Sequence, residues 1–320
     1  LLHIEQKSNL KIFMIIIREI FKFFFDKILT LSSVNFLNFI VTILSISIIV
    51  KFLGPIQWGK FVLIQLWPNY LGMLCLWSFN NNEVREISSQ RNSKNNINKI
   101  FSESFIIQFS LLIFSILVAS LITSFFKLIQ VNLMGFIGLS LMIIGHASQF
   151  HWILNGLEKI WQAAFFQLIP KIIILIFVSL IFYENYDYNK LLLIFGIGTT
   201  LSNLVCLIYI FKNLKIKLIN FSFVSVIKRF KFGFLYFFIS IVGNFKNLVF
   251  PIAINFFLGE YYVGLFSVLE RIKSIIVQIS QPITNSLYPR ISYLNIENLK
   301  KANIFRYIFF IILVLLILPF

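Results

Sequence analysis

The feature that most constrains this chain is a series of long apolar segments, each close to the length that crosses a bilayer. A transmembrane helix needs about 20 mostly apolar residues. We expect membrane-spanning helices at 28–50, 61–79, 104–126, 134–154, 163–183, 191–211, 232–258, 262–286 and 304–320. Hydrophobic residues make up 59% of the 320 residues and charged residues 12%. A water-soluble domain of this size could not bury so much apolar surface, so the sequence predicts an all-α transmembrane protein.

The basic residues indicate how the chain is oriented in the membrane. A net charge of +16 would by itself suggest a nucleic-acid partner. Here, however, the Lys and Arg residues form short clusters between the apolar segments, as cytoplasmic loops do when they face anionic lipid. Most of the 28 Lys and Arg residues fall on one side if the N-terminus is cytoplasmic. We therefore predict a cytoplasmic N-terminus and no nucleic-acid partner.

The N-terminal residues differ from the segments that follow. Residues 1–27 mix Lys and Arg with apolar residues and contain no small-residue cleavage site, which favours an amphipathic helix at the membrane surface. The chain begins at Leu1, so we expect the true start to differ, with Met14 as a candidate. Cys75 and Cys206 both lie inside apolar segments and predict no disulfide framework.

A short pattern occurs twice along the chain. The tripeptide FLG at 52–54 is followed by Gly59, and the same tripeptide at 257–259 is followed by Gly264 with identical spacing. Both copies are predicted at an outer turn between two spans. A repeat with the same topology in both halves predicts two six-helix bundles related by a pseudo-two-fold axis along the membrane normal.

This repeat divides the chain into three parts. Residues 1–27 form the interfacial segment, and 28–215 form the first six-helix bundle. Residues 216–320 form the first part of the second bundle, about three helices. The sequence ends inside an apolar segment, so we expect a C-terminally truncated form of a longer protein.

Five further sequence features stand in a fixed order along the chain: FLGPIQWG at 52–59, Arg85, LNGLE at 154–158, FLGEYYVGLFSVLERI at 257–272, and QPI with LYPRIS within 281–292. In their order and placement they resemble polysaccharide transporters of the Wzx-type O-antigen flippase family. The resemblance covers most of residues 28–292. It implies the MATE-like fold of the multidrug, oligosaccharidyl-lipid and polysaccharide exporter superfamily.

The resemblance also implies a function and a location. It implies flipping of undecaprenyl-pyrophosphate-linked oligosaccharide across a bacterial inner membrane for O-antigen or exopolysaccharide synthesis. The expected partners are this lipid-linked substrate, the bilayer, and the polysaccharide polymerase and chain-length proteins; no cofactor is expected. Family members often carry an acidic residue midway through the seventh span, where this chain has Asn244, Lys246 and Asn247.

Five charged residues are predicted near the middle of the bilayer: Lys171, Lys246, Glu270, Arg271 and Lys273. Each costs about 2.5–3.5 kcal/mol at the centre of a lipid-facing helix, so they must face a wet cavity or one another. Four cations and one carboxylate leave an excess of positive charge, which suits a pyrophosphate headgroup. We therefore predict that Lys171, Lys246, Arg271 and Lys273 line a cationic substrate cavity.

Other readings of these residues remain open. Glu270 and Lys273, three residues apart, could form a structural ion pair, and the Lys171 side chain could extend to the interface. Glu270 and His146 are the candidate groups for ion coupling, although a single intramembrane His can also be a hydrogen-bonded structural residue. His146 and His151 alone do not make a metal site.

Three functions are compatible with these features. A flippase breaks no covalent bond, and we expect the protein not to be an enzyme. A membrane-embedded polysaccharide polymerase or glycosyltransferase would need a sizeable external loop, which this sequence does not contain. A drug-type efflux pump of the same fold would favour acidic residues at the midplane, so the sign of the cavity charge separates it from the flippase.

Overall fold

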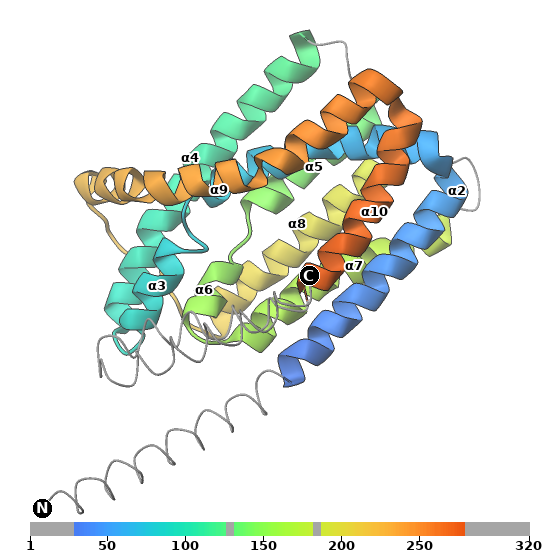
Figure 1. Ribbon diagram of the computed structural model, residues 1–320. Coiled ribbons are helices and arrows are strands. Elements are labelled where there is room, and N and C mark those ends of the chain that lie inside the picture. Colours follow the sequence, from blue (N-terminus) through green and yellow to red (C-terminus); the bar gives the residue numbers. More distant parts are fainter. Residues whose placement is uncertain (1–28, 126–130, 182–186, 279–320) are drawn as a thin grey trace, which may run out of the picture.

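The computed structural model describes residues 29–125, 131–181 and 187–278, and in these ranges the chain forms helices and no strands (Figure 1). The helices are α2 (Leu29–Leu76), α3 (Asn82–Ser89), α4 (Lys94–Phe125), α5 (Leu133–Ala147), α6 (His151–Gly156), α7 (Ile160–Ile181), α8 (Tyr188–Lys212), α9 (Phe223–Leu258) and α10 (Glu260–Gln278). The predicted interfacial helix of the N-terminus and the predicted span at 304–320 lie outside the described residues.

The surface of the molecule is the surface of a membrane protein. Six of the described helices are long and apolar enough to cross a membrane. Large apolar side chains stand exposed along them, including Phe256 at 82%, Leu133 at 77% and Phe257 at 77% of their full accessibility. Helices satisfy their backbone hydrogen bonds internally, so lipid can surround such surfaces without leaving polar groups unpaired. The chain is therefore a multi-pass membrane protein.

Several helix boundaries differ from those predicted. Helix α9 begins at Phe223 instead of 232, because its first turns carry Lys and Arg residues that an apolar window excludes although they are helical. Helix α4 begins at Lys94 instead of 104 for the same reason, and the second part of α2 begins just after Gly54 instead of at 61. Helix α5 ends at Ala147, where Ser148 leaves the helical conformation, and the short helix α6 follows. Helices α7 and α8 agree with the prediction to within a turn, and the end of the predicted span 262–286 lies outside the described residues.

The two FLG tripeptides form matching turns. Gly54 breaks α2 into two helices with φ 72° and ψ 166°, and Gly259 separates α9 from α10 with φ 88° and ψ 175°. Positive φ at this position favours glycine because other residues would be strained there. The sequence repeat thus corresponds to a repeated backbone conformation, and Figure 1 shows the two turns at the same end of the molecule.

The two turns also contact each other reciprocally. A methyl group added at Gly59 would overlap the backbone carbonyl of Glu260, and one added at Gly264 would overlap the carbonyl of Pro55. Gly264 and Glu260 are the repeat counterparts of Gly59 and Pro55. Each turn therefore makes the same contact with the other. The close approach requires glycine on both sides.

Small and polar residues hold α5 against α8. A Cβ at Gly138 or Gly196 would overlap the facing helix. Across the same interface the Thr200 hydroxyl donates to the Leu141 carbonyl at 2.8 Å, and the Asn203 amide donates to the Gly145 carbonyl at 2.7 Å. Membrane helices associate in this way because lipid provides no hydrophobic force between them.

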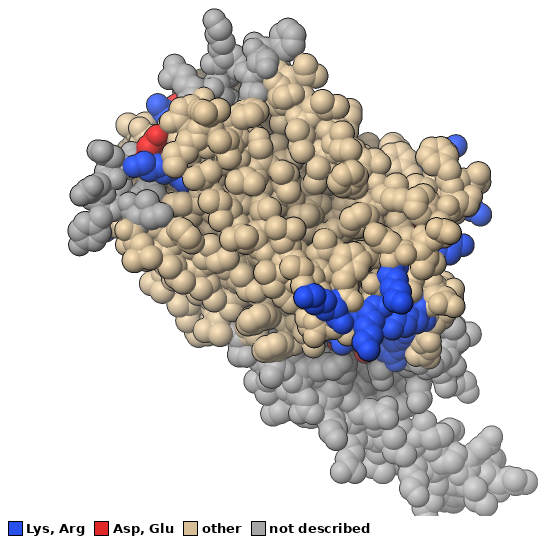
Figure 2. Space-filling view, turned by 180° about the vertical axis from the view of Figure 1, so that it is seen from behind, with Lys and Arg blue, Asp and Glu red and all other residues tan. Residues whose placement is uncertain are grey.

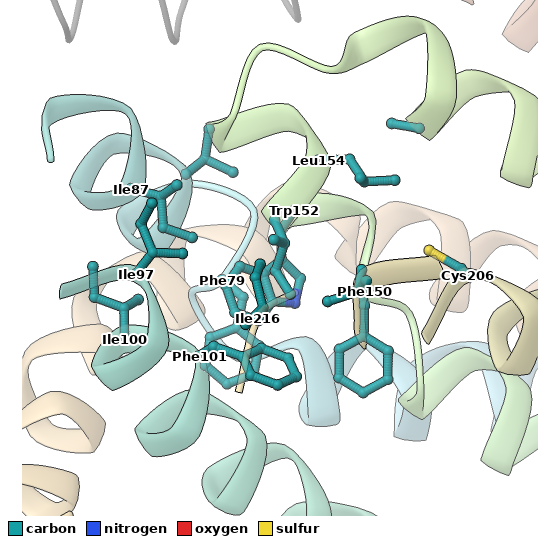
Figure 3. Close-up of a cluster of buried hydrophobic side chains, with 14 of the residues drawn as sticks. Phe79, Ile87, Ile97, Ile100, Phe101, Phe150, Trp152, Leu154, Cys206 and Ile216 are labelled. Carbon is teal, nitrogen blue, oxygen red and sulfur yellow. The ribbon is translucent and has the colours of Figure 1, made fainter. Parts of the chain in front are cut away.

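An aromatic core fixes the end of the molecule that contains α3. Figure 3 shows the rings of Phe79, Phe101, Phe150 and Trp152 gathered between α3, α4 and α6. The segment between α8 and α9 is tied to α4, because the backbone of Lys217 donates to the Asn98 side chain at 3.0 Å and that of Ile219 to the Ser102 hydroxyl at 2.9 Å. The starts of α4 and α9 are therefore held together.

Charged residues concentrate at the two ends of the molecule. Figure 2 shows most of the visible Lys and Arg atoms together at one end, a smaller group of charged atoms at the opposite end, and uncharged residues between them. We call the end with most of the visible Lys and Arg atoms, which contains α3, the α3 end. We call the opposite end, which contains the turns at Gly54 and Gly259, the glycine-turn end. The charge-poor band between them matches the region that lipid would surround.

Candidate functional site

Arg271 on α10 lies at the centre of the candidate site. Its side chain is half-buried, and its guanidinium carbon lies 4.8 Å from the centre of the Trp58 ring on α2. One guanidinium nitrogen donates to the Gln65 side chain, also on α2, at 3.3 Å. An Arg over an aromatic face is stabilised by the ring quadrupole, more strongly where water is scarce. Arg271 is thus held in place by groups that leave its positive charge uncompensated.

Trp58 is itself fixed. It is fully buried, its indole N–H donates to the Ser267 hydroxyl on α10 at 2.7 Å, and its ring stacks on Phe61 at 5.3 Å between centroids. A buried Trp needs a partner for its N–H, and Ser267 supplies it from the helix that carries Arg271. The α2–α10 contact therefore sets the position of the guanidinium.

Lys171 on α7 is the second cation of the site. It is half-buried, and its ammonium group lies within electrostatic range of Arg271. Within the described ranges, no carboxylate forms a salt bridge with either residue. Two like charges in a partly dehydrated place repel each other unless an anion lies between them. We call Trp58, Gln65, Lys171 and Arg271 the Arg271 site; its arrangement suits an anionic ligand.

The other predicted cations lie elsewhere. Lys273 pairs with Glu270 at 3.1 Å on an exposed part of α10, with 61% and 38% of the two side chains accessible. This is the structural ion pair that their spacing allowed. Lys246 lies on an exposed face of α9, and nearby the Asn244 carbonyl accepts a hydrogen bond from the Tyr70 hydroxyl of α2. Of the four predicted cavity cations, only Lys171 and Arg271 are half-buried with charges that act on each other, and their role in a substrate cavity stays a prediction.

His146 lies on α5 and packs against α2. Its Nδ1 lies 3.3 Å from the Gln149 amide, and its Cβ packs where Gly72 of α2 leaves room. Its Nε2 is buried and has no hydrogen-bond partner in the described structure. His151 lies 3.9 Å from the Cys206 sulfur. The two predicted coupling residues, Glu270 and His146, are therefore not brought into one site.

The structure also contains a charge cluster that the sequence did not predict. Arg229, near the start of α9, donates from Nε to Glu103 of α4 at 2.8 Å and from its Nη atoms to Glu86 of α3 at 2.5 and 3.2 Å. It lies 3.5 Å from Glu83, which is fully buried. Burial raises the pKa of Glu83, and the charge of Arg229 opposes this shift. We call these four residues the Arg229 cluster.

The sequence does not predict the Arg229 cluster, because its members are far apart along the chain. More than a hundred residues separate the three carboxylates from Arg229. Arg229 also lies between Lys228 and Lys231, where the sequence alone does not distinguish it from the other basic residues of a predicted cytoplasmic segment. One signal was available: Glu83 and Glu86 are three residues apart and therefore share a face of a short helix.

Comparison with known proteins places the chain in a family. A profile of the family described as polysaccharide biosynthesis protein matches residues 24–295. The chain belongs to this family. It is 25% identical to a protein of Shigella dysenteriae named "Putative O-antigen transporter", over 233 residues that make up 72% of this chain and 58% of the relative. The match thus spans less than two thirds of the relative's length.

Solved structures share the fold of this family member. A crystal structure of a MATE protein in complex with MaD3S superposes with a TM-score of 0.59 at 16% identity, covering 87% of this chain and 68% of the other. A multidrug resistance MATE transporter of the MOP superfamily in an outward-facing conformation gives a TM-score of 0.58 at 17% identity with the same coverage. At this level of identity the likeness shows the MATE-like fold, which the sequence predicted.

Proposed function

We propose that this protein carries a lipid-linked oligosaccharide with a phosphate-bearing headgroup across a bacterial inner membrane by alternating access. The observation that carries the proposal is the pairing of Arg271 and Lys171. Lys171 on α7 and Arg271 on α10 are both half-buried, their charges act on each other, and no carboxylate of the described residues forms a salt bridge with either. Charge-assisted hydrogen bonds to phosphate oxygens would offset the cost of keeping both charges out of water.

The arrangement of the helices fits alternating access. Arg271 belongs to α10 in the second bundle, whereas Trp58, Gln65 and Lys171 belong to the first. A ligand bound between Arg271 and Lys171 therefore bridges the two bundles. At the glycine-turn end the reciprocal contacts of Gly59 and Gly264 hold the bundles together. In this proposal that contact opens when the site faces the outer side.

The family supports a polysaccharide substrate, and the site charge separates it from the other candidates. The fold is shared with multidrug transporters, so the fold alone does not choose a substrate. An exporter of cationic drugs would place carboxylates where this chain has Arg271 and Lys171. In the proposal the α3 end and the N-terminus are cytoplasmic, since most of the Lys and Arg atoms visible in Figure 2 gather at the α3 end.

Complementation tests the proposal. The complete protein would be expressed in a strain that lacks its own O-antigen flippase but makes a compatible repeat unit, and surface polysaccharide would be scored by gel. We expect restored ladders with the wild type. Arg271→Ala and Lys171→Ala should each reduce them while membrane insertion stays normal. Absence of ladders despite normal expression would contradict the proposed function and favour an enzyme or a drug-type exporter.

A further inference from the structure

A second polar site lies at the α3 end, away from the Arg271 site. Residues of α3, α4 and α9 line a cavity of about 680 Å³, a volume within the usual range for small-molecule sites. Four cations contribute to its wall: Arg85, Lys99, Lys228 and Arg229. Two carboxylates, Glu86 and Glu103, and several amide and hydroxyl side chains complete it.

The charges of this cavity are separated into a floor and a rim. Arg229 forms salt bridges with both lining carboxylates, and its guanidinium nitrogens lie 2.5 Å from an oxygen of Glu86 and 2.8 Å from an oxygen of Glu103. Both carboxylates therefore pair with the half-buried Arg229, whereas Arg85, Lys99 and Lys228 are exposed. No salt bridge to these three residues is found among the described residues. The rim thus carries three cations without a salt bridge among the described residues, and the cavity wall keeps an excess of positive charge, with four cations against two carboxylates.

The floor offers an acceptor that lacks a donor. Glu103 is 2% exposed, and its second carboxylate oxygen, Oε1, has no hydrogen-bond partner among the described residues. A buried carboxylate oxygen without a partner is costly, and a hydroxyl group is the donor that would satisfy it without adding charge. The amide side chains of Asn82 and Gln90 in the same wall can exchange further hydrogen bonds with hydroxyls.

We propose that the α3-end cavity binds a glycosyl phosphate, with the phosphate at the rim formed by Arg85, Lys99 and Lys228 and the sugar hydroxyls toward Glu103. This assignment rests on the proposed function, because it identifies the ligand with the headgroup of the exported lipid. On the cytoplasmic side, the cavity would receive that headgroup before it moves to the Arg271 site. A soluble sugar phosphate has the same chemistry, so the test must separate the two sources.

Binding to the purified complete protein in lipid nanodiscs tests this site. Three probes would be titrated by calorimetry: a short-chain polyprenyl diphosphate carrying one sugar, the same diphosphate without sugar, and glucose 1-phosphate. We expect the sugar-bearing lipid to bind most tightly. The triple variant Arg85→Gln, Lys99→Gln, Lys228→Gln should weaken the affinity for this lipid by about tenfold or more. The loss of each charge-assisted contact lowers affinity by up to about tenfold.

A matched variant controls for surface charge. Lys212→Gln, Lys215→Gln, Lys217→Gln removes the same charge from exposed residues that lie at the same end but outside the cavity wall. Binding by this control should stay within about twofold of the wild type. An equal loss in both triple variants would overturn the proposal in favour of nonspecific attraction, as would unchanged binding in the cavity variant.

The remaining outcomes separate the parts of the proposal. Glu103→Gln should reduce the preference for the sugar-bearing lipid over the bare diphosphate; equal binding of these two probes to the wild type would overturn the sugar assignment. Glucose 1-phosphate binding as tightly as the lipid would overturn the link to the exported lipid. If the cavity variant both binds and exports normally, the cavity proposal fails and the proposed function stands. If the wild type binds as expected but does not restore export, the cavity proposal stands and the proposed function fails.

Discussion

Arg271 shows how one residue can carry a charge within a membrane-spanning protein. The face of Trp58 attracts the guanidinium, and Gln65 accepts one of its hydrogen bonds, at 4.8 Å and 3.3 Å respectively. Neither group is charged, so the site keeps its positive sign. An Arg has five donors in a fixed fork, and a phosphate group can use several of them at once. The same residue can therefore be structurally stable when empty and available to an anion.

Replacing Arg271 tests this role directly. Arg271→Gln should lower export by about tenfold or more, because the charge-assisted contact is lost. Arg271→Lys keeps the charge but loses the planar fork, and we expect an intermediate rate. Export is measured by surface polysaccharide in the complementation strain, with membrane insertion checked on the same cells. Lys51→Gln, an exposed site near the glycine turns, serves as control. Full export by Arg271→Gln would contradict a role of Arg271 in substrate binding.

Glycines determine how closely the helices approach at the glycine-turn end. Gly59→Val should destabilise the protein by about 1–3 kcal/mol, the usual cost of overpacking, because the backbone of Glu260 occupies the space that a side chain needs. Gly264→Val should behave alike, since its contact with Pro55 is the counterpart. Thermal unfolding in detergent measures both. Gly243→Ala on α9, where no atom lies within 4 Å, should leave the melting temperature unchanged or raise it. Equal melting temperatures for Gly59→Val and the wild type would contradict the reciprocal contact.

The Arg229 cluster joins α9 to α3 and α4. Arg229→Gln should cost about 3–5 kcal/mol of folding free energy, because it leaves buried carboxylates without their cation. Lys231→Gln, an exposed neighbour on the same helix, should cost little. A melting temperature of Arg229→Gln equal to that of Lys231→Gln would argue against a stabilising cluster.

The stability of this cluster should also depend on pH. The folded pKa of Glu83 lies above its ordinary value because the residue is buried, and Arg229 partly counters that rise. A carboxyl with a raised folded pKa costs increasing stability as the pH rises from the unfolded pKa through the folded one. Removing Arg229 raises the folded pKa further. We therefore expect the destabilisation by Arg229→Gln to be smaller in mildly acidic than in alkaline buffer, measured as the difference in melting temperature. A constant difference would contradict this.

The elements differ in how far the sequence predicted them. The long spans follow from apolar length alone, so α7 and α8 lie within a few residues of prediction. The short helices α3 and α6 carry no such signal; α3 forms because Val84 and Ile87 pack into the aromatic core at the α3 end. In the candidate site, Lys171 and Arg271 are predicted from the cost of charge in lipid; the structure places both on half-buried positions, and their binding of substrate stays a prediction. Trp58 and the Arg229 cluster were missed, because only the folded chain brings their partners together.

For the whole molecule, the charge distribution predicts an orientation that labelling can test. Asn92 at the α3 end and Ile56 near the glycine turns are both exposed, whereas the native Cys75 and Cys206 are buried. With a membrane-impermeant thiol reagent added to intact spheroplasts, Ile56→Cys should react and Asn92→Cys should stay protected until the membrane is opened. The opposite pattern would place the basic α3 end outside and contradict the proposed topology.

The measurement that tests the central claim most directly is transport by the complete protein in reconstituted vesicles. Lipid-linked oligosaccharide would be placed in the outer leaflet, and the fraction protected from an added glycosidase would be followed over time. The proposed function predicts protection that grows with wild-type protein and much more slowly with Arg271→Gln. Protection no greater than in protein-free vesicles would contradict it.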